Sequence, residues 1–431
     1  MSSLDIKLMH PRDQIVLIIS RIYRKGLTTT SGGNVSIIDD EGNIWITPSG
    51  IDKGNLRAED INCIKPDGTI TGKHKPSSEF PFHRAIYKKR PDLKAIIHAH
   101  PPALVSFSIA HIIPDTNIVS QAKHVCGPIG YAVYDVPGSE GLGDKISEVF
   151  VKGFNAVILE NHGTVVGGTD MKDTYQRFET LEFCARTIIY GKTIGDVKSL
   201  TDAQINTFEA QIPALQPEMS QVSYPSDERE KREEIIRIVR RACDQGLMIS
   251  TYGTVSVRWR ENDFLITPTN VLRWGITLED IVQIKGGKRE PGKLPSRAVW
   301  LHQEIYKCNP KVNSIIITQS PYLMAFSVTG NKFNVRTIPE SWIFLQDVPN
   351  VPFGSQFADE KIIPELISKE NPAVIIDNDA VLITGDKLLQ TFDRLEVAEF
   401  SAKSLVMGTV LGELKPIGDK EVEDLRKKFL S

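Results

Sequence analysis

Three histidines in the first half of this 431-residue sequence have the types and spacing of a metal site. His98 and His100 lie in the run KAIIHAH, which has the composition of a buried strand. Because alternate residues of a strand face the same side, the two imidazoles share one face, about 6–7 Å apart along the strand. His162 ends a second apolar run, NAVILENH. Three neutral imidazoles with an open fourth position are typical of a catalytic zinc ion, although cobalt, manganese and iron also accept such ligands.

An internal repeat decides whether the histidines form one site. On the spacing alone, two polar residues on a solvent-facing strand edge would fit equally well. The chain repeats with a period of about 220 residues, so that the ITP motif at 46–48 recurs at 266–268. Eight of the nine histidines lie in the first half. At the three metal positions the second copy has other residue types: Ile317, Gln319 and Asp379. The three histidines are replaced together, as expected if they formed one unit that the second copy lost.

The segment KPSSEFPFHRAIY supplies a candidate acid/base group, Glu79. A helix is expected from about Glu79 to Lys89, with Ser77 or Ser78 as its N-cap. The amino end of a helix offers unpaired N–H groups and the positive end of the dipole, which predicts an anion site. The glutamate could merely complement that dipole, but the second copy keeps the helix pattern with Ala298 in its place. A glutamate beside a metal-bound carbonyl is suited to moving a proton.

Two turns of small residues extend the predicted anion cradle, at 30–34 (TSGGN) and 47–50 (TPSG). Turns of this composition are usually only turns. The second copy nevertheless changes them alongside the metal site, with Thr254 for Asn34, Thr269 for Ser49 and Asn270 for Gly50. His83, by contrast, is retained as His302 in the copy without the metal ligands, so a structural role is expected for it.

The elements that must position these residues follow the same order in both copies. An amphipathic helix comes first, with one apolar face formed by Ile15, Val16, Ile19 and Ile22. Short strand-like runs joined by polar turns follow. Next come the helix at 79–89, the strand with two histidines, a helix at about 103–110, a strand pair and a long helix at about 171–190. This order predicts helices packed on both faces of a largely antiparallel sheet.

The repeat and the composition bound the domain organisation and the class of protein. A polar, proline-containing stretch separates the copies, which predicts a first domain at 1–215, a linker at 216–227 and a second domain at 228–431. Net charge is −3, and no apolar run could span a bilayer, so neither nucleic acid nor a membrane is an expected partner. The amino terminus lacks the pattern of a signal peptide, and the five scattered cysteines suggest no disulfide framework, so a cytoplasmic location is expected.

In combination, these motifs resemble the class II aldolase/adducin family. The matching stretches are SGGNVS at 31–36, ITPSG at 46–50, KPSSE at 75–79, IHAHP at 97–101 and NHG at 161–163. The resemblance implies two tandem copies of a three-layer α/β/α sandwich with a central, mainly antiparallel sheet. It implies one Zn²⁺ per chain in the first domain, or another divalent metal, held by the three histidines. It also implies that the phosphate of a small phosphorylated sugar is bound by Asn34, Ser49, Gly50, Ser77 and Ser78.

The reaction implied by the resemblance is retro-aldol cleavage of a ketose 1-phosphate through a zinc-stabilised enediolate, with Glu79 moving the proton. Epimerases of this fold have aspartate at that position, whereas dehydratases and decarboxylases use similar chemistry and stay open as alternatives. Adducin-like assembly modules lack the histidine set. The region 113–118 lacks the tyrosine with which fuculose-phosphate aldolases complete a neighbouring active site, so the general acid is unassigned. Family members typically form fourfold rings, which a homo-oligomer of two tandem chains would reproduce as a pseudo-fourfold ring.

Overall fold

The computed structural model describes residues 6–210, 214–261, 263–357 and 361–430. It divides into two compact units, the N-terminal unit (Asp5–Thr116 and Gln121–Arg186) and the C-terminal unit (Asn117–Ser120 and Thr187–Ser431). Each unit contains one eight-stranded sheet. Residues 211–213, which belong to the predicted first domain, lie outside the described residues.

The sheet of the N-terminal unit has the strand order β4-β3-β2-β1-β5-β8-β7-β6. Only β6 and β7 run parallel, and the other neighbours are antiparallel. The strands are β1 (Asn34–Ile38), β2 (Ile44–Ile46), β3 (Asn62–Ile64), β4 (Ile70–Thr71), β5 (Ala95–Ala99), β6 (Ile129–Ala132), β7 (Ala156–Leu159) and β8 (Gly163–Gly168). The predicted histidine strand is therefore the central strand β5, and the predicted strand pair is β7–β8.

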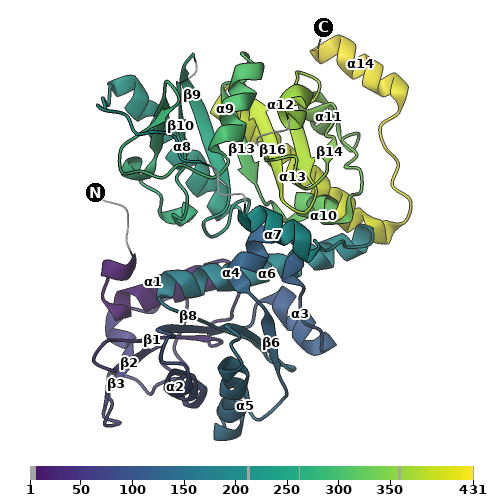
Figure 1. Cartoon of the computed structure of the whole chain (residues 1–431). Helices are drawn as coiled ribbons and strands as arrows, with labels where there is room; N and C mark the ends of the chain where they lie inside the picture. The colour runs from purple at the N-terminus through teal and green to yellow at the C-terminus, as the bar shows by residue number, and fades with distance from the viewer. Residues whose placement is uncertain (1–5, 211–213, 262, 358–360, 431) are drawn as a thin grey trace. The chain divides into compact units, whose positions relative to one another are not determined.

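Helices cover both faces of this sheet, as Figure 1 shows for α1 and α6 on one face and α2 and α5 on the other. The helices are α1 (Pro11–Arg24), α2 (Phe80–Lys89), α3 (Pro102–Ala110), α4 (Ser120–Cys126), α5 (Glu140–Val151) and α6 (Met171–Ile194), of which Ser120 in α4 and the residues of α6 from Thr187 on belong to the C-terminal unit. Short 3₁₀ turns occur at Ile6–Leu8, Ala58–Asp60 and Thr116–Ile118. Ile96 of β5 packs with side chains of α2 and α5 in one hydrophobic core. Because side chains of a strand alternate, His98 faces the same layer as Ile96, beneath the start of α2.

The C-terminal unit repeats this architecture with the strand order β12-β11-β10-β9-β13-β16-β15-β14. Its strands are β9 (Thr254–Arg260), β10 (Asp263–Ile266), β11 (Val282–Lys285), β12 (Lys288–Arg289), β13 (Ser314–Thr318), β14 (Asn350–Val351), β15 (Ala373–Ile376) and β16 (Ala380–Gly385). Only β14 and β15 pair in parallel. The position of each strand therefore has a counterpart in the N-terminal sheet.

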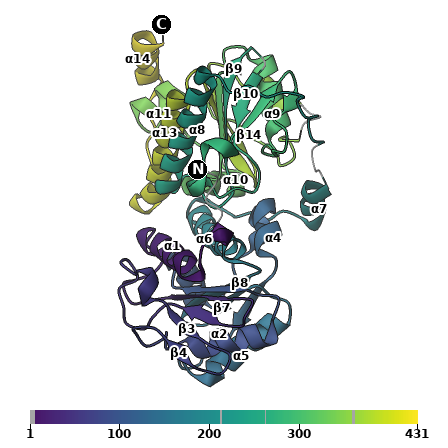
Figure 2. The same cartoon turned by 90° about the vertical axis from the view of Figure 1, so that its left-hand side faces the viewer.

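Two hydrophobic layers flank the C-terminal sheet, with α8 and α13 on one face and α9 on the other (Figure 2). The helices are α7 (Asp202–Ala210), α8 (Ser226–Asp244), α9 (Val299–Cys308), α10 (Pro321–Thr329), α11 (Pro339–Leu345), α12 (Ile362–Leu366), α13 (Leu388–Gly408) and α14 (Asp419–Phe429). Short 3₁₀ turns lie at Arg273–Gly275, Leu278–Asp280 and Thr409–Leu411. Alternate residues of β13 belong to different cores, Ile316 to the α8 side and Ile315 and Ile317 to the α9 side. The predicted fold class, two tandem three-layer α/β/α sandwiches with mainly antiparallel sheets, is confirmed.

A buried glutamate on the last long helix of each copy explains part of the sequence repeat. Glu182 on α6 accepts a hydrogen bond from the backbone N–H of Leu104, 3.3 Å away in the first turn of α3. Glu399 on α13 accepts the equivalent bond from Leu323 at 3.0 Å, in the first turn of α10. Each glutamate thus satisfies backbone donors that a helix amino end leaves unpaired. The glutamate is therefore retained in both copies because the fold needs it, and its retention does not depend on the metal cluster of the first copy.

The part of the chain that the structure describes contains no helix whose length and apolar character would let it cross a membrane.

Candidate metal centre

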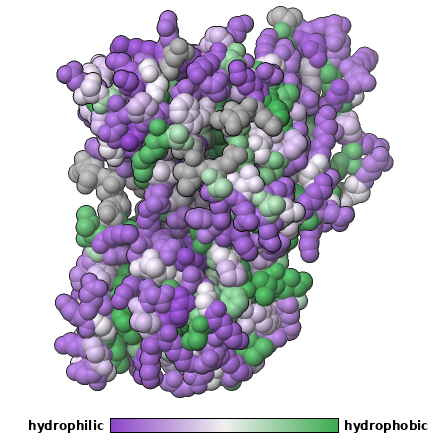
Figure 3. Space-filling view, viewed as in Figure 1, coloured by the Kyte–Doolittle hydropathy of each residue, from purple (hydrophilic) through white to green (hydrophobic). Residues whose placement is uncertain are grey.

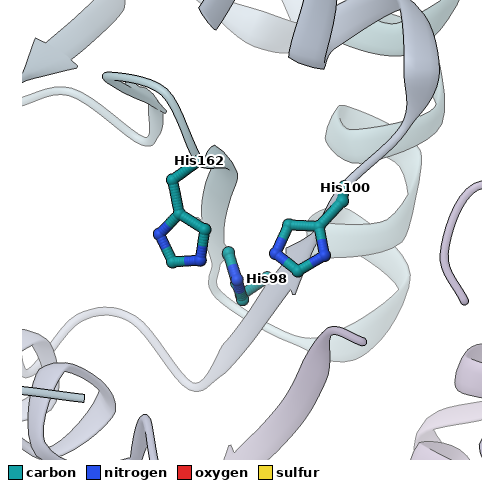
Figure 4. Close-up of side chains that lie close together, drawn as sticks. All are labelled: His98, His100 and His162. Atoms are coloured by element: carbon teal, nitrogen blue, oxygen red, sulfur yellow. The ribbon is translucent and has the colours of Figure 1, made fainter. Parts of the chain in front are cut away.

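The rings of His98, His100 and His162 converge in one place, as Figure 4 shows. One ligand nitrogen from each ring lies within 4.8 Å of the other two. His98 belongs to β5, and His100 lies just beyond the end of that strand. His162 sits in the turn between β7 and β8, and β8 pairs with β5, which brings the turn beside His100. The pairing of two strands far apart in sequence therefore assembles the three imidazoles.

Burial keeps these imidazoles neutral, which is the form that binds a metal. Desolvation lowers the pKa of His98 to about 3 and the pKa of His162 to about 4. Burial also lowers the pKa of His100. The Nδ1–H of His98 donates to the carbonyl oxygen of Thr164 at 2.9 Å, because a carbonyl can only accept. This bond fixes the tautomer and leaves the lone pair of His98 Nε2 directed into the cluster.

Glu79, at the start of α2, completes the cluster. Its Oε2 lies 3.2 Å from Nε2 of His98, and its Oε1 lies 3.3 Å from Nε2 of His162. The side chain of Asn34 donates to Glu79 Oε2 at 2.6 Å. The carboxylate is therefore placed to serve either as a fourth metal ligand or as a base beside the metal.

The donor set fits a bound cation. Nε2 of His98 carries a lone pair and faces a carboxylate oxygen, which also offers only lone pairs. Among the described residues, the buried atoms His98 Nε2, His100 Nε2 and Glu79 Oε1 have no hydrogen-bond partner. Buried polar atoms without partners are costly, and a divalent ion among them would satisfy all three. Three imidazoles and a carboxylate are ligands that zinc binds in catalytic sites.

The predicted anion-cradle turns meet beside this cluster. Ser49 N–H donates to the carbonyl of Lys75 at 2.9 Å, and Ser77 N–H donates to the carbonyl of Thr47 at 3.1 Å. The segment with Ser49 and Gly50 therefore lies alongside the segment with Ser77 and Ser78. Ser49, Gly50 and Ser78 are exposed, whereas Ser77 is buried. Gly50 has φ +69°, a conformation that suits glycine, and its counterpart Asn270 has φ +54°, so the turn keeps its shape in the second copy.

Asn34 lies in a different place from the other predicted phosphate-binding residues. It is the first residue of β1 and pairs with His98 of β5 in the sheet. Its side chain is 2% exposed, and both polar atoms are engaged, Nδ2 with Glu79 and Oδ1 with Nε2 of His83. The structure thus brings the side chain of Asn34 to the acid/base residue and not to the exposed turns.

The predicted N-cap of α2 is wrong. The N-cap residue is Glu79 and not Ser77 or Ser78, and no side chain caps the helix. A turn precedes the helix, because Phe80 N–H donates to Ser77 O at 3.1 Å while Ser77 Oγ accepts from Glu79 N–H at 3.3 Å. The following residue, Pro81, has no N–H to offer. Few unpaired backbone donors remain at this helix end, so anion binding there would depend on the serine side chains and the neighbouring turn.

A buried cation beneath the cradle was not predicted. Lys53 is 1% exposed, its Nζ donates to the carbonyl of Pro48 at 2.6 Å, and burial lowers its pKa to about 8. Arg273 has the same task in the second copy, because its Nη2 donates to Pro268 O at 2.9 Å. The signal was present in the sequence, since both copies have a cation at this aligned position.

The equivalent positions of the C-terminal unit hold no metal-binding cluster. Ile317 pairs with Thr254 as His98 pairs with Asn34, which confirms the alignment of the two copies. Thr254 Oγ1 lies 2.6 Å from Ser296 Oγ. Burial raises the pKa of Asp379, the counterpart of His162, to about 6. Within the described residues, His98, His100 and His162 are the only group of three or more such side chains close enough to share an ion.

Comparisons with known proteins agree with the geometry. The model of the Class II Aldolase and Adducin N-terminal domain matches residues 13–189 and again residues 233–406. The 5-deoxy-D-ribulose 1-phosphate aldolase of Bacillus thuringiensis is 33% identical over 46% of this chain and 93% of its own length. The 3-oxo-tetronate 4-phosphate decarboxylase of Haemophilus influenzae is 30% identical over 46% and 95%. The L-fuculose phosphate aldolase of Methanocaldococcus jannaschii is 34% identical over 40% and 91%.

Proposed function

We propose, on the premise that this chain belongs to the class II aldolase and adducin family, that its N-terminal unit is a metal-dependent carbon–carbon lyase acting on a phosphorylated sugar. Relatives at 33% and 34% identity are aldolases of phosphorylated sugars. The observation that carries the proposal is the convergence of three neutral imidazoles with the carboxylate of Glu79. That set combines an electrophile site with a base, as cleavage next to a carbonyl requires.

His98, His100 and His162 would hold the metal, and zinc is the ion that best suits their nitrogen donors. The metal would supply an electrophile for the negative charge that develops on a substrate oxygen when the carbon–carbon bond breaks. Glu79 accepts or returns the proton of the substrate hydroxyl group, since one of its oxygens is held by Asn34 and the other has no hydrogen-bond partner among the described residues.

The substrate phosphate is proposed to bind at the turns beside the cluster. Ser49, Gly50 and Ser78 are exposed there, and Ser77 lies next to them. The buried ammonium group of Lys53 lies beneath the same turn and contributes positive charge. We assign to Asn34 a contact with Glu79 in place of the phosphate contact expected from sequence.

Decarboxylation of a phosphorylated 3-oxo acid is the second candidate, because one relative at 30% identity is a decarboxylase of this type. Both reactions break a carbon–carbon bond next to a carbonyl group, so the same residues would serve either one. An adducin-like assembly role is disfavoured by the intact histidine set, and an epimerase by glutamate at position 79.

Metal analysis and product identification test the proposal. We expect about one divalent ion per chain in the wild-type protein, which a single cluster per chain requires, and its loss in His98→Ala. Ketose 1-phosphates should release an aldehyde, and Glu79→Ala should lower kcat by roughly 10²- to 10⁴-fold, the usual contribution of a general base. Release of CO₂ from a 3-oxo acid phosphate without aldehyde release from any ketose phosphate would favour the decarboxylase.

Absence of bound metal, or undiminished metal in His98→Ala, would contradict the proposal. The matched control is Gln319→Ala, which changes the counterpart of His100 in the C-terminal unit and should leave the metal content unchanged.

We further propose that two chains assemble into a pseudo-fourfold ring. The N-terminal unit exposes apolar side chains at the end of α3 and in the segment after it, where Ile109 is 59%, Ile112 49% and Ile113 43% exposed. Figure 3 shows a hydrophobic area over this part of the unit. Clustered apolar side chains on a surface are typical of protein–protein contacts.

A further inference from the structure

A continuous chain of hydrogen bonds leads from the core of the N-terminal unit to Glu79. Tyr87 Oη lies 2.7 Å from Ser36 Oγ, and Ser36 Oγ lies 2.7 Å from His83 Nδ1. His83 Nε2 contacts Asn34 Oδ1, and Asn34 Nδ2 reaches Glu79 Oε2 at 2.6 Å. All five side chains are buried. Asn34 and Ser36 are alternate residues of β1, so their side chains lie on the same face of the sheet. His83 and Tyr87 are four residues apart on α2, so their side chains lie on the same face of the helix, which packs on that face of the sheet.

The direction of every bond in this chain is determined by chemistry. A carboxylate accepts only, so the amide group of Asn34 must donate to Glu79 and its carbonyl oxygen must face His83. That carbonyl also accepts only, so Nε2 of His83 carries the proton. Burial holds the pKa of His83 well below its usual value, so the ring is neutral and its Nδ1 accepts from the Ser36 hydroxyl group. Tyr87 then donates to Ser36, and all four bonds point toward the carboxylate.

The C-terminal unit contains the tyrosine, serine and histidine of this hydrogen-bond chain but neither the asparagine nor the glutamate. Tyr306 Oη and His302 Nδ1 each lie 2.6 Å from Ser256 Oγ. Thr254 replaces Asn34, and Ala298 replaces Glu79. Nε2 of His302 has no hydrogen-bond partner among the described residues. The tyrosine–serine–histidine trio therefore belongs to the shared fold, whereas its extension to a carboxylate exists only in the unit that has the metal cluster.

Among the residues that the structure describes, no other side chain donates a hydrogen bond to Glu79 Oε2. Glu79 is the N-cap of α2, yet its carboxylate does not cap the helix. Nε2 of His98, 3.2 Å from Oε2, carries a lone pair and cannot donate to it, and Nε2 of His162 lies beside the other oxygen, Oε1. The amide of Asn34, oriented by His83, thus determines which oxygen is engaged and which is available.

We infer that His83 and Asn34 are positioning residues for Glu79. They hold its Oε2 by a hydrogen bond and leave its Oε1 available for proton transfer. The inference rests on the proposed acid/base role of Glu79 and deepens it. Its consequence is that His83 acts on the reaction through two intervening bonds, without contacting metal or substrate.

Paired substitutions in the two units test the inference. His83→Leu interrupts the hydrogen-bond chain. His302→Leu makes the same change in the C-terminal unit, where Ala298 replaces the glutamate. We expect His83→Leu to lower kcat by roughly 10- to 100-fold with KM and metal content within about threefold of wild type, the range seen when an outer partner of a functional group is removed. His302→Leu should leave kcat unchanged while lowering the melting temperature by a similar amount.

Two further variants guard against simple misfolding. Asn34→Thr introduces the residue that the C-terminal unit already has at this position, so the strand tolerates it, and kcat should again fall by roughly 10- to 100-fold. His83→Gln carries an amide nitrogen near the place of Nε2 and should recover most of the lost kcat. Equal effects of His83→Leu and His302→Leu on kcat, loss of kcat only in proportion to lost metal, or wild-type kcat in Asn34→Thr would each overturn the inference.

A measurement without catalysis separates this inference from the proposed function. In ¹⁵N NMR spectra of histidine-labelled protein, His83 and His302 should both be neutral Nε2–H tautomers. Glu79→Ala should shift the ring signals of His83 and leave those of His302 in place. If these shifts occur in a protein without lyase activity, the positioning chain stands and the proposed function fails. If Glu79→Ala leaves the His83 signals unchanged in an active enzyme, the positioning chain fails alone.

Discussion

At the scale of single residues, burial sets the charge of the groups in the N-terminal unit. It lowers the pKa of His98 and His162 far below neutrality, which keeps one unprotonated nitrogen of each ring available to bind a metal. It also raises the pKa of Glu182 to about 7, although the Arg186 charge and backbone N–H groups of α3 oppose the shift. The same desolvation thus favours the neutral form of both a base and an acid.

Glu182 should make the stability of the N-terminal unit depend on pH. Its ordinary pKa is 4.5 and its pKa in the folded protein is about 7, so between these values the folded state keeps a proton that the unfolded chain has lost. Stability is therefore fully present below about pH 4.5 and falls as pH rises to about 7, by an amount on the order of 3 kcal/mol. Urea unfolding of the metal-free protein at about pH 5 and pH 7.5 measures this change, and Glu182→Gln should reduce it.

The metal-free form is the right sample, because metal binding to histidines depends on pH in its own way. Parallel pH dependence of wild type and Glu182→Gln would show that another group is responsible.

At the scale of elements, the close approach of β8 to β5 determines where His100 can sit. A Cβ on Gly163, the first residue of β8, would lie 2.6 Å from the carbonyl oxygen of Ala99 and 2.7 Å from Cδ2 of His100. The equivalent residue of the C-terminal unit is Ala380, where the histidine is replaced by Gln319. The missing side chain at position 163 therefore makes room for the imidazole ring of His100.

Gly163→Ala should displace His100 and weaken metal binding, by roughly 10- to 100-fold in affinity, while the fold survives as it does around Ala380. Competition with a chromogenic chelator measures the affinity, and circular dichroism checks the fold. Ala380→Gly is the matched control and should leave metal affinity unchanged. Wild-type affinity in Gly163→Ala would mean that the strands separate enough to accommodate the methyl group.

Part of the fold and of the candidate site could be predicted from the sequence alone. The alternation of residues in KAIIHAH was enough to predict the strand. Comparison of aligned positions in the two copies then selected His98, His100 and His162 as one cluster. The partners of Asn34 were not predictable, because they depend on the register of β1 against β5 and on the rotation of α2, which spacing does not determine. The same applies to Lys53, whose burial depends on how two turns pack.

At the scale of the whole molecule, the exposed apolar end of α3 predicts self-association. Sedimentation equilibrium should give twice the 48.1 kDa mass of one chain. The double variant Ile112→Lys and Ile113→Lys should give the mass of a single chain, because burying two lysines in a contact is unfavourable. Ile70→Lys, at another exposed position, should keep the wild-type mass. A monomeric wild-type protein would exclude the ring.

Both sheets end in very short strands, and this has a consequence for how the chain reaches its native state. Three of the four edge strands, β4, β12 and β14, have only two residues, and the fourth, β6, has four. Two copies of one fold in a single chain create a risk of strand exchange between the copies, and of aggregation with other chains, through unpaired edges. Such short edges offer few backbone groups for pairing, and in β12 the backbone N–H and carbonyl of Arg289 are already engaged by Pro217 and Met219. The tandem chain should therefore avoid misassembly during synthesis, even though it carries two similar sheets in succession.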